Sequence, residues 1–265
     1  MNFGPGSQGN PAQAHGLVQV LRGVVQSIER KYANVGDVVP LLPFDIASID
    51  AVLGGGLAVA ALHEIAAAGE TEIAAATAFT VALAARQPPA RAVLWIGEDM
   101  TVRENGILYG TGLDAFGLSP ERIITVTVAR AADVLWAMEE ALRCRAVGVV
   151  IGEIRNARID DVALRRLSLA ATERGRLALL LRTIPAAQPI AAATRWVIDA
   201  APSVPSRDSI GPPRIGVQLV RNRHGRLDSW VLEWNCVERR FQLVSAHPQP
   251  LAAAALDRPH QTAVA

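Results

Sequence analysis

The chain has 265 residues, of which 51% are hydrophobic and 19% charged, and its formal net charge is +1. So large an apolar fraction excludes a disordered chain. The near-neutral charge excludes a general attraction to nucleic acid or anionic membranes, so any contact with a polyanion must come from a local cluster of charges.

The sequence predicts a cytoplasmic protein. Its first residues lack the basic start and apolar stretch of a secretory signal. The longest strongly apolar run without a charge, residues 73–85, is shorter than the ~20 residues of a membrane-spanning helix. Cys144 and Cys236 have no CxxC partner, which is typical of buried free thiols in a reducing compartment. The histidines show no zinc-site spacing, so we expect no metal.

The chain divides into three parts. Residues 1–16 are rich in Gly, Gln, Asn and Pro, and we expect them to be mobile. Apolar residues at helical spacing predict an amphipathic helix over residues 17–34, which either packs on its own domain or serves as a docking arm. The expected parts are a flexible N-terminus with this helix (1–39), an α/β domain (40–245) and a loose C-terminal tail (246–265).

Within the central part, short continuous apolar runs alternate with helical stretches. The expected strands cover residues 62–66, 92–97, 123–128, 147–151, 177–181, 196–200, 217–220, 229–234 and 241–244. The expected helices cover residues 72–86, 104–110 and 131–145, and a further helix is capped by Asp160 and stops at Gly175. This alternation predicts an α/β fold, a mostly parallel central sheet flanked by helices. The late strands lack intervening helices, so we expect them to be antiparallel.

The first strand-to-helix turn is where an α/β protein often binds phosphate. A P-loop there requires the pattern G-x-x-x-x-G-K-[ST]. In this chain the turn contains one glycine, Gly69, followed by Glu70, Thr71 and Glu72, and Lys31 is the only lysine in the sequence. The two carboxylates place negative charge where a triphosphate would lie. We therefore expect this degenerate turn to bind no nucleotide cofactor and the chain to have no ATPase activity.

Several motifs occur in an order that resembles the RecA-like core, and more closely the ImuA family of bacterial damage-induced mutagenesis proteins. The resemblance covers about residues 40–245. The motifs are FDIASIDAVLGGGL (44–57), HEI (63–65), LWIGE (94–98), DVLWAMEEALR (133–143), VGVVIGE (147–153), and LVRNRHG followed by SWVLEW (219–234). The resemblance implies that Glu98 stands at the position of the RecA catalytic glutamate and Glu153 near that of the Walker B aspartate. Without a bound nucleotide, both positions would be vestigial.

The resemblance also implies a function. ImuA-type proteins resemble RecA without an intact P-loop, and they act in the SOS response beside an ImuB-type polymerase-like protein and an error-prone DnaE-type polymerase during translesion synthesis. The expected role is therefore that of a non-catalytic adaptor in DNA repair, with RecA as a further candidate partner. Such a protein would be associated with the nucleoid when engaged.

Two groups of residues are candidate contacts with a partner or with DNA. Arg155 and Arg158 fall where RecA proteins place their first DNA-facing loop, although a solvated face with local ion pairs is the alternative. Arg221, Arg223 and Trp230 lie on the expected C-terminal hairpin, and Arg and Trp dominate the energetics of protein interfaces. Simple packing of the sheet is the alternative there. Residues 185–193 are uncharged, so any DNA contact should be weak.

Two other functions remain open from the sequence. An atypical ATPase would use Glu98 and Glu153, with an arginine or a partner subunit in place of the missing lysine. A DNA-binding module would use the arginine clusters, and its affinity would fall steeply with salt.

Overall fold

The structure is a computed structural model that describes residues 40–154, 159–183, 185, 191–205, 210–223 and 225–244. These residues belong to one compact unit that begins at Pro40. The expected N-terminal helix, the expected C-terminal tail, Arg155 and Arg158 lie outside the described residues. No helix in the described part is long and apolar enough to cross a membrane.

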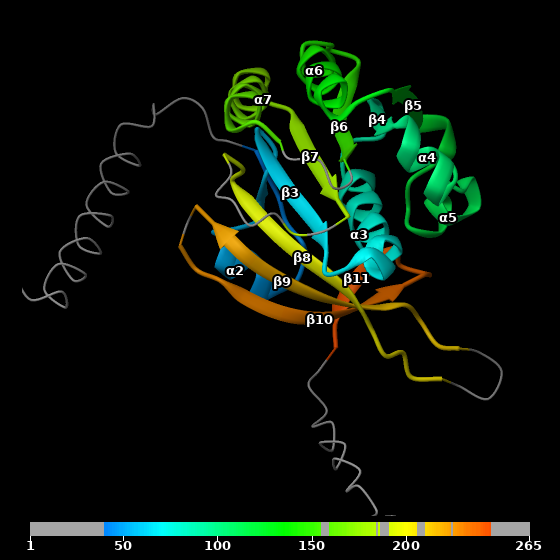
Figure 1. The fold of residues 1–265 in the computed structure, drawn as a ribbon. Coiled ribbons are helices and arrows are strands. Elements are labelled where there is room, and N and C mark those ends of the chain that lie inside the picture. The colour runs from blue at the N-terminus through cyan, green and yellow to red at the C-terminus, as the bar shows by residue number, and fades with distance from the viewer. Residues whose placement is uncertain are drawn as a thin grey trace, which may run out of the picture. The chain divides into compact units, whose positions relative to one another are not determined.

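A mixed β-sheet forms the centre of this unit (Figure 1). Its strands are β3 (Ala61–Ala67), β4 (Ala92–Glu98), β5 (Ile123–Val128), β6 (Val147–Ile154), β7 (Leu177–Arg182), β8 (Thr194–Ala201), β9 (Arg214–Asn222), β10 (Asp228–Asn235) and β11 (Arg240–Leu243). Their spatial order is β11-β10-β9-β8-β3-β7-β6-β4-β5. The strands from β8 to β5 in this order pair in parallel, whereas β8 to β11 pair antiparallel. This arrangement confirms the predicted fold class.

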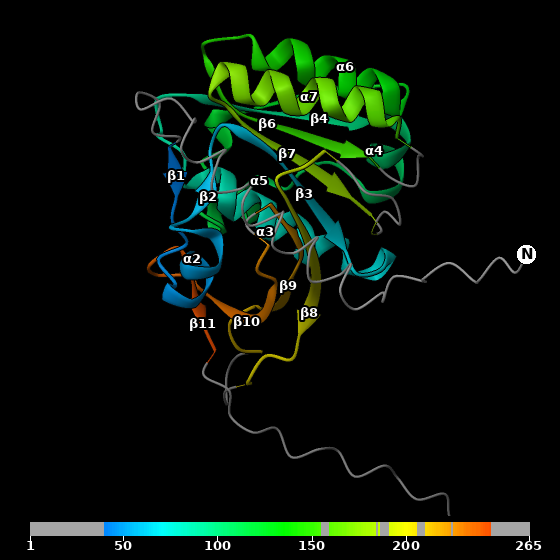
Figure 2. The ribbon, with the colours of Figure 1, turned by 90° about the vertical axis from the view of Figure 1, so that its left-hand side faces the viewer.

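Helices cover both faces of the parallel part of the sheet. The helices are α2 (Ala47–Leu53), α3 (Ile73–Ala85), α4 (Asp99–Asn105), α5 (Gly110–Ala115), α6 (Ala131–Leu142) and α7 (Asp161–Arg174), with 3-10 turns η1 (Glu70–Glu72) and η2 (Pro120–Arg122). Figure 2 shows α6 and α7 side by side on one face, and α3 lies on the other. One buried apolar cluster therefore lies under α6 and α7, and a second packs against α2 and α3.

Capping residues explain where the helices begin and end. Asp160 accepts a hydrogen bond from the Val162 N–H at 3.1 Å, and Gly175 ends α7 with a φ of 60°, so this helix matches its prediction. The prediction of a helix over residues 104–110 was wrong. Helix α4 starts directly after β4, and Gly106, with a φ of 79°, ends it inside the predicted span.

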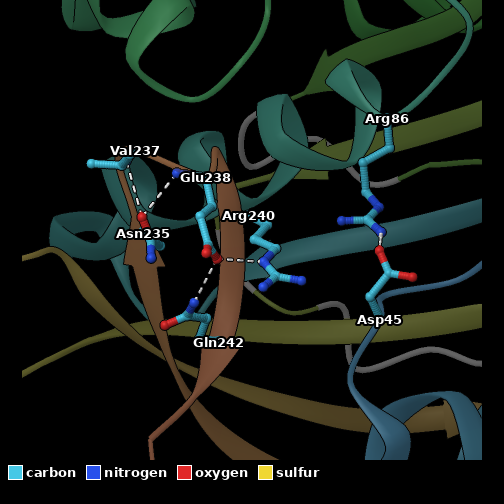
Figure 3. Close-up of polar contacts among 7 residues, drawn as sticks. All are labelled: Asp45, Arg86, Asn235, Val237, Glu238, Arg240 and Gln242. Atoms are coloured by element: carbon cyan, nitrogen blue, oxygen red, sulfur yellow. Dashed lines mark hydrogen bonds and ion pairs between the residues drawn. The ribbon is translucent and has the colours of Figure 1, made fainter.

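The LGGGL segment forms a turn that precedes the sheet. Strand β1 (Leu41–Leu42) pairs antiparallel with β2 (Leu57–Ala58), and α2 lies between them. Gly56 has a φ of 144°, and a Cβ atom there would lie 2.7 Å from the Leu42 carbonyl oxygen. Any other residue at this position would combine a strained backbone with a steric clash, so the turn requires glycine here. Nearby, the Asp45 carboxylate forms an ion pair with Arg86 of the segment after α3 (Figure 3).

The C-terminal strands are joined by a well-capped turn. The Asn235 side chain accepts hydrogen bonds from the N–H groups of Val237 and Glu238 at 3.0 and 2.9 Å. Glu238 Oε2 in turn accepts from Arg240 Nε at 2.7 Å and from Gln242 Nε2 at 2.9 Å (Figure 3). These contacts fix β11 as the last strand of the antiparallel part of the sheet.

Trp230 belongs to the core of the antiparallel part. Its exposed fraction is 8%, and its ring centroid lies 6.3 Å from that of Trp196. This position favours the alternative that the sequence left open, packing of the sheet, over contact with a partner through this ring. The sequence predicted that the two cysteines are buried. This prediction was wrong, because Cys144 and Cys236 are both exposed.

Candidate functional site

The turn after β3 is too short for a P-loop. Only Ala68 and Gly69 separate the strand from η1, which runs directly into α3. The Gly69 carbonyl accepts a hydrogen bond from the Glu72 N–H at 3.0 Å, which closes the 3-10 turn. A P-loop places six residues, G-x-x-x-x-G, before its lysine, so that their N–H groups can surround a phosphate. This turn has no comparable loop.

Hydrogen bonds to β8 hold the same turn in place. The Glu72 carboxylate accepts a hydrogen bond from the Ala200 N–H at 2.8 Å, and Thr71 Oγ1 donates to Glu72 Oε1 at 3.1 Å. The Ala68 N–H donates to the Ile198 carbonyl at 2.8 Å. Glu72 therefore has a structural role that the sequence did not reveal, and its carboxylate remains at the turn where phosphates would approach.

A buried polar chain lies in the middle of the sheet near the starts of β3 and β8, at the opposite end of β3 from the turn. Trp196 Nε1 donates to Thr194 Oγ1 at 2.7 Å, and Thr194 Oγ1 lies 2.7 Å from His63 Nδ1. His63 Nε2 lies 2.8 Å from the Ala58 carbonyl, which can only accept. Nε2 must therefore carry the proton, while Nδ1 accepts from the threonine hydroxyl. Burial lowers the pKa of His63 to about 4, so the ring stays neutral.

This neutral histidine predicts a loss of stability in mild acid. The unfolded chain binds a proton near pH 6.5, whereas the folded chain holds His63 neutral down to about pH 4. Stability is therefore full above pH 6.5, and the free energy of unfolding should fall by up to about 3 kcal/mol as the pH approaches 4. Urea denaturation across this range measures the effect. The decrease should be clearly smaller in His63→Gln, and an equal decrease in both proteins would contradict the assignment.

Glu98 and Glu153 lie on neighbouring strands. Glu98 is the last residue of β4, and Glu153 of β6 is in register with Gly97. Trp95 Nε1 donates a hydrogen bond to Glu153 Oε2 at 2.9 Å. Burial raises the pKa of Glu153, and the charge of Glu98 raises it further. The structure thus brings the two expected carboxylates together, and it adds Trp95, which the sequence analysis did not single out.

A cavity of about 360 Å³ adjoins the Glu153 carboxylate. Its sheet side is formed by β5 and by Trp95, Gly97 and Glu153, and its helix side by residues of α3, α4 and α5. Among the described residues that line it, Glu153 carries the only charge. This lining lacks the cations that a triphosphate would require.

A second charged cluster lies within the sheet, near the candidate arginines. Glu64 of β3 is fully buried, and its Oε2 accepts a hydrogen bond from Arg195 Nε at 2.6 Å. Arg182 Nε lies 3.8 Å from Glu64 Oε1, and Arg221 is in register with Arg195. Arg223 donates to the Ala191 carbonyl at 3.0 Å. The sequence analysis found Arg221 and Arg223 but missed Glu64, whose signal was a lone acid in an apolar strand.

The sequence is similar to curated proteins of known name. No protein-family model matches it. It is 35% identical over 211 residues to the protein named ImuA of Caulobacter vibrioides strain NA1000 / CB15N, and equally to that of strain ATCC 19089 / CB 15. The matched region covers 73% of this chain and 83% of each relative.

Proposed function

The chain belongs to the ImuA family, which implies a role in damage-induced mutagenesis, and we propose that it fulfils this role as a non-catalytic RecA-like adaptor. In this proposal the α/β domain binds other proteins of translesion synthesis and hydrolyses no nucleotide.

The turn after β3 carries the proposal. It has two residues before η1, no lysine, and a carboxylate held in place by the Ala200 N–H. A triphosphate at this turn would meet negative charge without a compensating cation, and the loss of one charge-assisted hydrogen bond alone costs about 1.5–3 kcal/mol. The local structure thus supports a domain that has kept the RecA-like order of elements without nucleotide binding.

The surroundings of Glu98 and Glu153 support the adaptor over the alternative, an atypical ATPase. In an ATPase a glutamate orients the attacking water, and cations stabilise the charge of the transferred phosphoryl group. In the described part of the cavity next to Glu153, no cationic side chain lines the wall. The hydrogen bond from Trp95 instead gives Glu153 a structural partner.

We further propose the partners that the family implies: an ImuB-type polymerase-like protein and an error-prone DnaE-type polymerase, with RecA as an additional one. Arg221 and the neighbouring Arg195 lie within the sheet around Glu64, which supports only weak contact with DNA through this cluster. The adaptor would act in the cytoplasm, at the nucleoid.

Co-purification with the ImuB-type protein of the same organism tests the proposal. The full chain should form a complex in the absence of nucleotide, and added Mg-ATP should change neither the yield nor the stoichiometry. Phosphate release by the complex, with and without single-stranded DNA, should equal the background without protein, whereas RecA under the same conditions provides the positive control. A complex that forms only with Mg-ATP, or that releases phosphate, would contradict the adaptor role.

A further inference from the structure

The cavity beside Glu153 combines one carboxylate with aromatic walls. Its volume of about 360 Å³ is within the ~300–1,000 Å³ range of sites that bind small ligands. The lining residues include the aromatic residues Trp95, Tyr109 and Phe116, and Glu153 is the charged lining residue among those described. Carboxylates and aromatic faces both attract organic cations.

A hydrogen bond from Trp95 orients the Glu153 carboxylate, and its second oxygen can accept a further hydrogen bond. Trp95 Nε1 donates to its Oε2 at 2.9 Å, while Oε1 has no hydrogen-bond partner among the described residues. Gly97 lies beside it in the parallel register, and even a Cβ atom at this glycine would be 3.9 Å from Oε2. Burial and the charge of Glu98 both disfavour the ionised form of Glu153, and a cation bound at this carboxylate would offset that cost.

The mouth of the cavity is apolar and exposed. Ile107, at 84% exposure, and Tyr109, at 73%, both line the cavity and lie in the loop between α4 and α5. Large apolar side chains gathered at one opening are typical of a surface that a protein partner covers.

We propose that this cavity receives an arginine side chain of a partner protein, with its guanidinium on Glu153 and its aliphatic stem between the aromatic walls. An arginine matches the site because its planar group forms charge-assisted hydrogen bonds with carboxylates and stacks on aromatic rings. Buried arginine anchors are also frequent among the residues that dominate interface energies. This inference rests on the proposed adaptor function, since it assigns the space next to the degenerate turn to a protein partner.

Two matched peptides test the charge requirement on the full chain. One is acetyl-Leu-Arg-Leu-amide, and the other carries citrulline, which has nearly the same shape without the charge. Titration monitored by the NMR signal of the Trp95 indole N–H should show the arginine peptide binding about tenfold more tightly. Glu153→Gln, which keeps the size of the side chain, should abolish this preference, whereas Glu121→Gln on exposed η2 should retain it. Equal binding of the two peptides, or a preference that survives Glu153→Gln, would overturn the inference.

Further titrations of the same kind distinguish an arginine side chain of a partner protein from a small organic cation and from a lysine side chain. Tyr109→Ala should weaken the arginine peptide more than it weakens free propylguanidine, because the rim contacts the peptide. If propylguanidine binds as tightly as the arginine peptide, the site binds a small organic cation and the proposed protein partner is contradicted. If a lysine peptide binds as tightly as the arginine peptide, the proposed preference for a guanidinium group is contradicted. Mg-ATP is titrated separately: if it binds, the proposed function fails, whereas failure of the peptide arms alone removes only this inference.

Discussion

Replacing Glu64 by glutamine is expected to lower the free energy of unfolding by about 3–5 kcal/mol. Glu64 is fully buried, and its carboxylate lies between Arg195 Nε at 2.6 Å and Arg182 Nε at 3.8 Å. Burial raises the pKa of Glu64, and the two guanidinium groups oppose this effect. The variant would leave two nearly buried arginines without the carboxylate that faces both of them.

Urea denaturation followed by far-ultraviolet circular dichroism measures this loss. Asp99→Asn provides the matched control, because it removes one carboxylate from the exposed Asp99–Arg103 ion pair of α4. The control should lose less than about 1 kcal/mol. If Glu64→Gln were as stable as Asp99→Asn, the buried cluster would not contribute as described.

Replacing Trp196 by alanine should cost about 3–5 kcal/mol as well, but for a different reason. The fully buried ring lies among Phe44, Phe79 and Trp230, at centroid distances of 5.7, 5.8 and 6.3 Å. Its removal leaves a cavity in this aromatic cluster and also removes the donor to Thr194 Oγ1. The loss therefore combines missing apolar contacts with a disturbed hydrogen-bond chain.

Two further variants separate these contributions in denaturation experiments. Trp196→Phe keeps an aromatic ring without the N–H group, so it should be less destabilised than Trp196→Ala. Trp136→Ala removes a tryptophan that is 64% exposed on α6, and it should change stability by less than about 0.5 kcal/mol. Equal stabilities of Trp196→Ala and Trp136→Ala would argue against a central role of the aromatic cluster.

Local chemistry made much of the fold predictable. The boundaries of α7 follow from Asp160 and Gly175, because a side-chain cap and a left-handed glycine act within a few residues. The strand segments of the large sheet were predictable because each is a short apolar run between helices or turns, whereas the short pair β1 and β2 was not predicted. The antiparallel end of the sheet followed from the absence of helices between the last strands.

Long-range contacts were not predictable in this way. Glu64 and Arg195 are 131 positions apart, so nothing in either segment shows that they meet. The cavity beside Glu153 combines residues from α3 to β6, and its chemistry appears only when these elements pack. At the turn after β3, the sequence showed the missing lysine, whereas the bond from the Ala200 N–H to Glu72 required the sheet.

Isothermal titration calorimetry of the full chain with Mg-ATP tests most directly whether the turn after β3 is unable to bind a nucleotide. We expect no saturable heat that corresponds to a Kd below about 100 μM. Saturable binding in that range, abolished by a substitution at Gly69, would contradict the non-catalytic adaptor.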